Sequence, residues 1–416
     1  MASPTKRTNS NITDSLPFSD VIASLNPSIT DPTERTNPSM NDLLPLSTLT
    51  ERTNPNIAES LLTLPFELQA EILSMLPVKL LLQLSCVCKS FNSMIFNPYF
   101  VRKHLNISTT HFACYKYLFN FNIKCYPLQS MFTDIITTNV IDLVFPFHNS
   151  PGDNLYSIAC SCHGILCLPD HYQYTVVLCN PSIRKFKKLP PFQKPLFGTK
   201  IHANHGFGYD PVSDHYKVVV LYHCHSTSTG IHEDTTTVKV LTLGTHYWRR
   251  IPTIPFDAIF DYGAGKWVSA TVNWLAYTKS YRIGQTFIVS FDLANESFQK
   301  IFLPDQGKRD GCECNITLLV WRDCLSIILD HDVWVMKTFG IQESWVKLFS
   351  VSYLQNRGMS SILTNASYIC DGQLLLELWQ IQKVIVYDSK NDTFKVTRFT
   401  RLPEVCVESL LTPDII

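Results

Sequence analysis

The chain has 416 residues, of which 45% are hydrophobic, so it can bury a full core and is long enough for more than one domain. Lys plus Arg and Asp plus Glu both total 35, and this zero net charge argues against broad nucleic-acid binding, which needs a positive field. No run approaches the roughly 18 uncharged apolar residues that a membrane span requires.

The N-terminal stretch and the cysteines predict where the protein resides. Residues 1–15, MASPTKRTNSNITDS, lack the apolar region of a secretory signal. The 14 cysteines are scattered without the regular spacing of a small secreted scaffold, which favours free, buried thiols in a reducing compartment. We therefore expect a cytoplasmic and/or nuclear protein with no membrane partner.

Residues 1–60 are predicted to form a disordered tail. They are rich in Asn, Thr, Ser and Pro, and they repeat one template, as KRTNSNITDSLPF (6–18), ERTNPSMNDLLPL (34–46) and ERTNPNIAESLLTLPF (51–66). Such a segment has too little apolar surface to offset the entropy lost on folding. The third copy runs directly into the next part of the chain.

The segment 64–95 carries a strong helical pattern. Leu68, Ile72 and Leu76 recur at the three- and four-residue steps that place side chains on one helical face. Pro77 interrupts the backbone ladder, so one helix ends there, a second follows, and a third is centred on Phe91. Three short helices with this much leucine cannot cover it themselves, and uncovered apolar surface indicates a partner.

From about residue 110 the hydrophobic period changes to two, and no helix is expected after 105. Short runs rich in Val, Ile, Tyr, Phe and Thr alternate with Gly, Asn, Asp and Pro clusters, which is the pattern of strands joined by turns. These runs include YKVVVLYH (216–223), QTFIVSFDL (285–293) and KVIVYDS (383–389).

The strands also repeat as a group. An aromatic residue closes each unit, at Phe186, Trp248, Phe298, Trp345 and Phe394, with spacings of 62, 50, 47 and 49 residues. Three of these spacings match the roughly 50-residue period of a kelch-like four-stranded blade. The long first spacing is interpreted as an enlarged loop at 223–236. A sixth, composite blade would join 111–148 to the tail 407–413 and remove exposed edges. An open β-sandwich is the alternative.

The helical segment resembles the F-box. The positions that carry the resemblance are Leu64, Pro65, Leu68, Ile72, Leu73, Leu76, Pro77, Leu80, Val87, Cys88, Lys89 and Phe91. Phe91 departs from the family pattern, in which Trp is usual at that place. The region after it resembles the F-box associated domain of plant F-box/kelch-repeat proteins, through motifs such as CSCHGILCL (160–168), LCNPSIRKFKKLP (178–190) and GFGYDPVSDHYKVV (206–219).

Composition, the strand repeats and the resemblance together predict three parts: a disordered tail (1–60), a three-helix F-box (61–107), and an all-β, kelch-like propeller of about six four-stranded blades (110–416), an α+β multidomain fold. The resemblance implies a non-catalytic substrate receptor of a Skp-cullin-F-box ubiquitin ligase. The partners would be a Skp-type adaptor, through it a cullin scaffold, and an unidentified target protein. The residues implied to bind the adaptor are Leu64, Pro65, Leu68, Ile72, Leu76, Pro77, Leu80, Val87, Lys89 and Phe91.

Other candidate sites give weaker signals. His223, Cys224, His225 and His232 are spaced too tightly for a structural zinc site, so a polar surface loop is expected, with no metal and no cofactor. The C-x-C pairs 160/162 and 312/314 are interpreted as buried structural thiols, and the basic run 184–188 as a solvated outer strand.

The sequence lacks the motifs of common enzyme classes: the nucleophile elbow, the Gly-rich phosphate-binding loop and the zinc-protease helix. The alternative function is a propeller hydrolase or lyase with an appended helical module.

The residues that contact the target cannot be identified from the sequence. Loops that vary in length carry function on a common scaffold, and the candidates are 222–235, 254–266, 304–314 and 353–362. We expect 222–235 or 304–314 to contact the target.

Overall fold

A computed structural model gives the structure of the chain. It describes residues 64–116, 122–131, 140–144, 158–170, 174–192, 200–226, 233–252, 254–261, 263–278, 285–304, 315–351, 354, 363–368, 372–378 and 382–414. The predicted tail, 1–60, lies outside these residues. The chain divides into two compact units, 1–74 and 75–416. Among the described helices, none has the length and apolar character needed to cross a bilayer.

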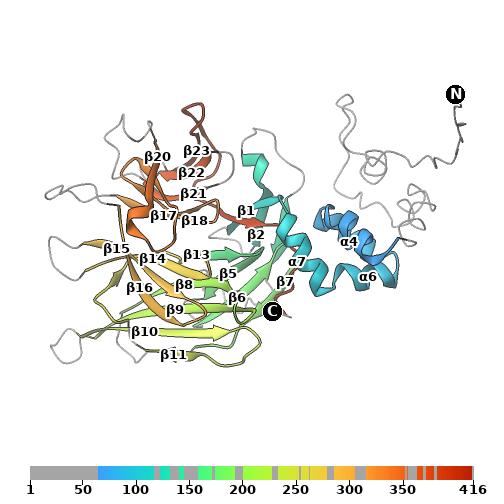
Figure 1. The fold of residues 1–416 in the computed structure, drawn as a ribbon, viewed down its shortest axis with the longest axis horizontal. Helices are drawn as coiled ribbons and strands as arrows, with labels where there is room; N and C mark the ends of the chain where they lie inside the picture. Colours follow the sequence, from blue (N-terminus) through green and yellow to red (C-terminus); the bar gives the residue numbers. More distant parts are fainter. Residues whose placement is uncertain are drawn as a thin grey trace, which may run out of the picture. The chain divides into compact units, whose positions relative to one another are not determined.

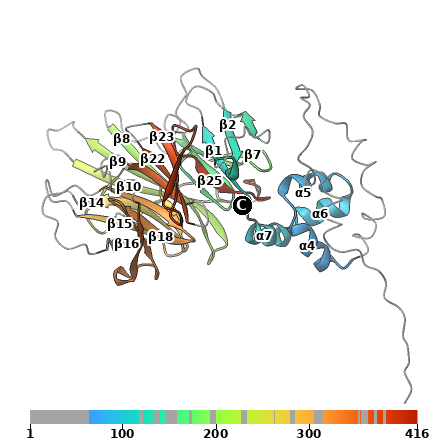
Figure 2. The same cartoon turned by 90° about the horizontal axis from the view of Figure 1, so that it is seen from above.

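Four helices occupy the region in which three are predicted. They are α4 (Phe66–Ser74) in the first unit, and α5 (Val78–Ser85), α6 (Lys89–Ile95) and α7 (Pro98–Ile107) in the second. The helix missed by the prediction, α7, begins where the Asn97 side chain accepts a hydrogen bond from the Tyr99 backbone N–H at 2.9 Å, with Pro98 in the first turn. Figure 2 shows α5, α6 and α7 as one group.

Six antiparallel sheets follow the helices, and each is one blade of a propeller (Figure 1). In order from inner to outer strand, blade 1 holds β25 (Glu404–Val407), β1 (His111–Lys116), β2 (Asn122–Pro127) and β3 (Ile141–Val144); blade 2 holds β4 (Cys160–Cys162), β5 (Ile165–Asp170), β6 (Thr175–Asn180) and β7 (Lys185–Lys188). Blade 3 holds β8 (Lys200–Asp210), β9 (His215–Ser226), β10 (Glu233–Thr242) and β11 (Arg249–Ile251).

The other three blades continue in chain order. In blade 4, β12 (Ile259–Phe260) and β13 (Lys266–Val268) both pair with β14 (Thr271–Tyr277), followed by β15 (Thr286–Asp292) and β16 (Ser297–Phe302). Blade 5 holds β17 (Ile316–Trp321), β18 (Cys324–Leu329), β19 (Asp332–Met336) and β20 (Trp345–Ser350). Blade 6 holds β21 (Leu363–Tyr368), β22 (Gln373–Leu378), β23 (Lys383–Asp388) and β24 (Thr393–Val396).

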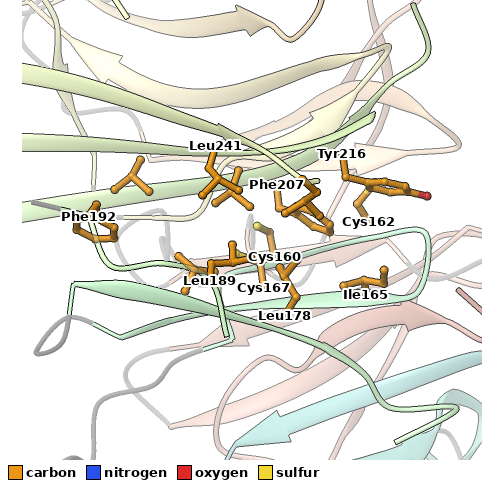
Figure 3. Packing of buried hydrophobic residues seen from close by; sticks show 14 of the residues in the cluster. Cys160, Cys162, Ile165, Cys167, Leu178, Leu189, Phe192, Phe207, Tyr216 and Leu241 are labelled. Carbon is orange, nitrogen blue, oxygen red and sulfur yellow. The ribbon is translucent and has the colours of Figure 1, made fainter. Parts of the chain in front are cut away.

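The blades close into a ring. A buried apolar cluster joins each blade to the next, and the last of these clusters joins blade 6 back to blade 1. Figure 3 shows the cluster between blades 2 and 3, where Cys160, Cys167 and Leu178 meet Phe207 and Leu241. Closure confirms the six-bladed propeller and rules out the open β-sandwich, because every sheet packs on two neighbours.

The predicted composite blade is present, but its C-terminal strand lies slightly earlier in the chain than predicted. β25 comes from the C-terminal part of the chain and pairs with β1, with Phe112 opposite Cys406. The paired strand is Glu404–Val407, just before most of the tail predicted to supply it.

The repeated aromatic residues occupy equivalent positions in four of the blades. Phe186, Phe298, Trp345 and Phe394 each lie at the start of the outermost strand of a blade.

The prediction of an enlarged loop at 223–236 is wrong at both of its ends. β9 continues to Ser226 and β10 begins at Glu233, so His223 pairs with Thr236 in a long hairpin, and only 227–232 lie outside the described residues. The sequence misleads here because the hairpin extension is polar, rich in Thr and His, and lacks the apolar alternation of a half-buried strand. Thr nevertheless has high strand propensity.

Candidate functional site

Helix α4 presents apolar side chains to solvent. It begins after Pro65, whose carbonyl oxygen accepts a hydrogen bond from the Gln69 N–H at 3.0 Å, and Glu67 suits the positive end of the helix dipole. Ala70 and Leu73 are buried. Leu68, in contrast, is 50% exposed and Phe66 is also exposed. Pro65 is exposed, and Leu64 and Ile72 are half-buried.

Helices α5 and α6 also leave predicted adaptor-binding residues accessible. Val87, in the short connection between them, is 62% exposed. Pro77 and Lys89 are exposed as well, and Leu80 is half-buried. The connection is fixed by backbone hydrogen bonds, since the Val87 N–H donates to the Leu84 carbonyl at 3.0 Å. The exposed side chain of Val87 therefore has a defined place on the surface.

Two residues of the predicted set are buried and are corrected to core positions. Leu76 is 7% exposed and Phe91 is 1% exposed, so neither offers surface to a partner. The Phe91 N–H donates to the Cys88 sulfur that caps α6 at 3.5 Å, which sets the start of that helix. The contribution of Leu76 and Phe91 is to hold the helices in place. For the other eight, adaptor binding stays a prediction.

Several exposed apolar residues were missed by sequence reasoning. Met75, Phe96 and Tyr99 are 60%, 44% and 63% exposed. Met75 lies within the span of the predicted set, and Phe96 and Tyr99 follow it along the chain. A signal was available for Met75, because it lies seven residues after Leu68 and therefore at helical spacing from it. Phe96 and Tyr99 gave none, because their exposure depends on where α6 ends and α7 begins.

A buried histidine ties α7 to the start of the second unit. His104 is buried, and its Nε2 lies 3.0 Å from the Leu76 carbonyl oxygen, so the neutral ring donates from Nε2. Its Nδ1 is buried and has no hydrogen-bond partner among the described residues. Burial lowers the pKa of His104 below its ordinary value of 6.5, and the hydrogen bond to Leu76 opposes this only in part.

We expect this histidine to make the protein less stable in mild acid. The unfolded chain takes up a proton on His104 near pH 6.5 and the folded chain only at lower pH, so stability is constant above pH 6.5 and falls as the pH drops below it. Melting temperatures measured from pH 8 to 5 should show a smaller acid loss for His104→Gln, whose amide keeps the donor to Leu76. An equal loss in both proteins would contradict this role.

The remaining candidates from the sequence behave as structural features or lie outside the described residues. The side chains of His223, Cys224 and His225, and all of His232, are outside, as are 305–314 and the pair 312/314. No group of three potential metal ligands occurs among the described residues. Cys160 and Cys162 are buried in β4, as predicted. The basic run forms β7, the outermost strand of blade 2, also as predicted.

Comparison with known protein families gives two matches along the chain. A family model for the F-box domain matches residues 61–103. A family model for the F-box associated beta propeller domain matches residues 136–407, which is more than half of the chain. The two matches fall on the helical region and on the six-bladed propeller respectively.

Curated relatives with similar sequences come from Arabidopsis thaliana. An F-box/kelch-repeat protein is 29% identical over 325 residues, covering 75% of this chain and 84% of the relative. The F-box protein CPR1 is 23% identical over 378 residues, covering 85% of this chain and 89% of the relative. Another F-box protein is 25% identical over 387 residues, with coverage of 82% and 88%. The similarity therefore spans most of each relative.

Proposed function

Because the chain belongs to the family of F-box proteins with an F-box associated beta propeller domain, we propose that it is the substrate-recognition subunit of a Skp-cullin-F-box ubiquitin ligase. Its helices would bind a Skp-type adaptor, and through it a cullin scaffold, while the propeller binds a target protein. The chain would supply proximity, since holding a target lysine near an activated ubiquitin replaces a bimolecular encounter. A separate conjugating enzyme would carry out the transfer of ubiquitin to that lysine.

The observation that carries this proposal is the exposure of apolar side chains on the helices. Leu68 and Val87 are each at least half exposed although they belong to a sequence pattern rich in leucine. The fully buried centre of a protein interface is more apolar than its rim, and a few residues near that centre supply most of the binding energy. A free-standing helical module would instead place them in its own core.

Reconstitution tests the proposed ligase role. The chain would be mixed with a Skp-type adaptor, a cullin, its RING subunit, a conjugating enzyme and proteins captured from plant cells in which the proteasome is blocked. We expect ubiquitin chains on a subset of captured proteins only when this chain is present. Transfer that proceeds equally without it would overturn the proposal. From the reducing compartment expected for the cysteines, we also propose that this activity occurs in the cytoplasm, the nucleus or both.

We propose that the target contacts 222–235, which lies within the β9–β10 hairpin, or 304–314. Tyr222 and Thr237 face each other in the hairpin, so replacing 223–236 by Asn-Gly would join them through a two-residue turn without disturbing the blade. We expect this variant, or one in which 305–314 becomes a Gly-Ser segment of equal length, to lose captured targets while still binding the adaptor. Capture of the full target set by both variants would exclude these segments.

A further inference from the structure

The segment after β25 is fixed to two parts of the second unit. The Glu408 N–H donates to the Thr110 carbonyl at 2.8 Å, next to the end of α7. The Asn180 side-chain amide of blade 2 donates to the carbonyls of Ser409 at 3.0 Å and Leu411 at 2.7 Å. Glu408 and Ser409 are both buried. The backbone of this segment is therefore held where the propeller ring closes.

From this position the Glu408 side chain lies at the start of α5. Burial raises the pKa of its carboxyl group, and a hydrogen bond from the backbone N–H of Val78, the first residue of that helix, opposes this rise only in part. The residue before the helix is Pro77, which has no side-chain cap, and the first turn of α5 contains no acidic residue. The first amides of a helix need acceptors, and a carboxylate there also interacts favourably with the helix dipole. Glu408 thus supplies from the propeller a cap that the helix lacks.

A second link joins α7 to blade 3. The Arg102 guanidinium donates to both carboxylate oxygens of Asp214, at 2.7 and 2.6 Å. Asp214 lies in the β8–β9 turn with a positive φ of 57°, and its carboxylate also accepts a hydrogen bond from the Tyr209 hydroxyl at 2.5 Å. An exposed ion pair alone stabilises little. Here Nη2 of Arg102 contacts both carboxylate oxygens, and the Tyr209 hydroxyl holds the same carboxylate, so the position of the pair is defined.

We propose that Glu408 and Arg102 are positioning residues that fix the helices α5 and α7 in one orientation on the propeller. The inference rests on the proposed function for its meaning, because a ligase receptor must hold its adaptor-binding helices and its target-binding propeller at a set distance. Glu408 acts through the end of α5, and Arg102 through the turn that carries Asp214. The two contacts lie on different helices and reach different parts of the propeller.

The experiment measures the distance between helix and propeller in the full chain. Spin labels on unnatural amino acids would replace Ser93 in α6 and Thr393 in β24, both exposed, because the exposed Cys86 thiol would interfere with cysteine labelling. We expect one narrow distance distribution in the parent protein. Combining Glu408→Ala with Arg102→Ala should broaden it by about a factor of two or add a second population, at a temperature well below the melting temperature of the variant.

Matched variants keep the result specific. Glu408→Gln with Arg102→Ala retains an acceptor oxygen for the Val78 N–H and should give a narrower distribution than the double alanine variant. Lys124→Ala, which removes an ion pair with Asp142 inside blade 1, should leave it unchanged. If Glu408→Ala unfolds the protein, the distance distribution is measured instead in Arg102→Ala and in Asp214→Ala, each as a single variant, and both should be broader than the parent.

A broad distribution in the parent protein, or a narrow one in the alanine variants, would overturn the inference. Adaptor binding is measured in a separate assay. A chain that holds its helices rigidly and yet binds no Skp-type adaptor would overturn the proposed function alone.

Discussion

Replacing Leu68 and Val87 together by aspartate is expected to abolish binding of a Skp-type adaptor while the propeller stays folded. Both side chains are at least half exposed in the free chain, so a charged group can be accommodated there without unfolding the helices. In the complex each carboxylate would be buried against an apolar surface. Losing two anchors at about 2 kcal/mol or more each weakens binding by about a thousandfold.

The measurement is calorimetric titration of the adaptor into each variant, with melting temperatures recorded in parallel. Val144→Asp with Tyr247→Asp is the matched control, because these residues are 72% and 63% exposed but belong to the propeller. The control should bind like the parent protein. Leu76 is unsuitable for such a test, since aspartate at a buried position would disrupt the fold itself. Undiminished binding by the Leu68/Val87 variant would exclude these residues from the interface.

Lys217→Ala is expected to destabilise the propeller strongly. The Lys217 ammonium is buried between blades 3 and 4, 3.1 Å from the Asp210 carboxylate and 3.3 Å from that of Glu296, and it also donates to the Leu293 carbonyl. Burial raises the pKa of Asp210, but hydrogen bonds from Ser213, the Val212 N–H and Lys217 outweigh it and leave that pKa below 3.8. Asp210 therefore remains charged at neutral pH.

Removing the lysine leaves a buried carboxylate without its cation, a change that typically costs about 3–5 kcal/mol. Urea unfolding followed by tryptophan fluorescence should show a matching drop in the free energy of unfolding. Lys124→Ala serves as the control, because its pair with Asp142 spans 3.9 Å at the surface and should contribute about 1 kcal/mol or less. Equal losses of unfolding free energy in the two variants would show that the buried ion pairs of Lys217 stabilise the propeller no more than the surface pair of Lys124 does.

The fold was largely predictable because its physical signal is local and repeated. Each blade must bury both faces, so its middle strands are nearly continuous apolar runs. One aromatic residue also marks the outermost strand in most blades. The requirement to remove exposed edges also predicted the composite blade. The long β9–β10 hairpin was missed because its tip is polar, and α7 was missed because its start depends on the Asn97 cap and not on an apolar stripe.

The candidate site was predictable as a set but not residue by residue. Leu68 and Leu76 occupy the same kind of position in the helical pattern, yet one is 50% exposed and the other 7%. Periodicity identifies an apolar face without telling whether the chain or a partner covers it. The contact between Glu408 and Val78 joins opposite ends of the chain, so no local pattern could have indicated it.

Binding of the purified full-length chain to a purified Skp-type adaptor tests the central claim most directly. Titration calorimetry, with the molar mass of the product measured by light scattering, would give affinity and stoichiometry together. The account predicts a one-to-one complex with a Kd below about 1 μM. A chain that remains monomeric beside the adaptor and releases no heat would contradict it.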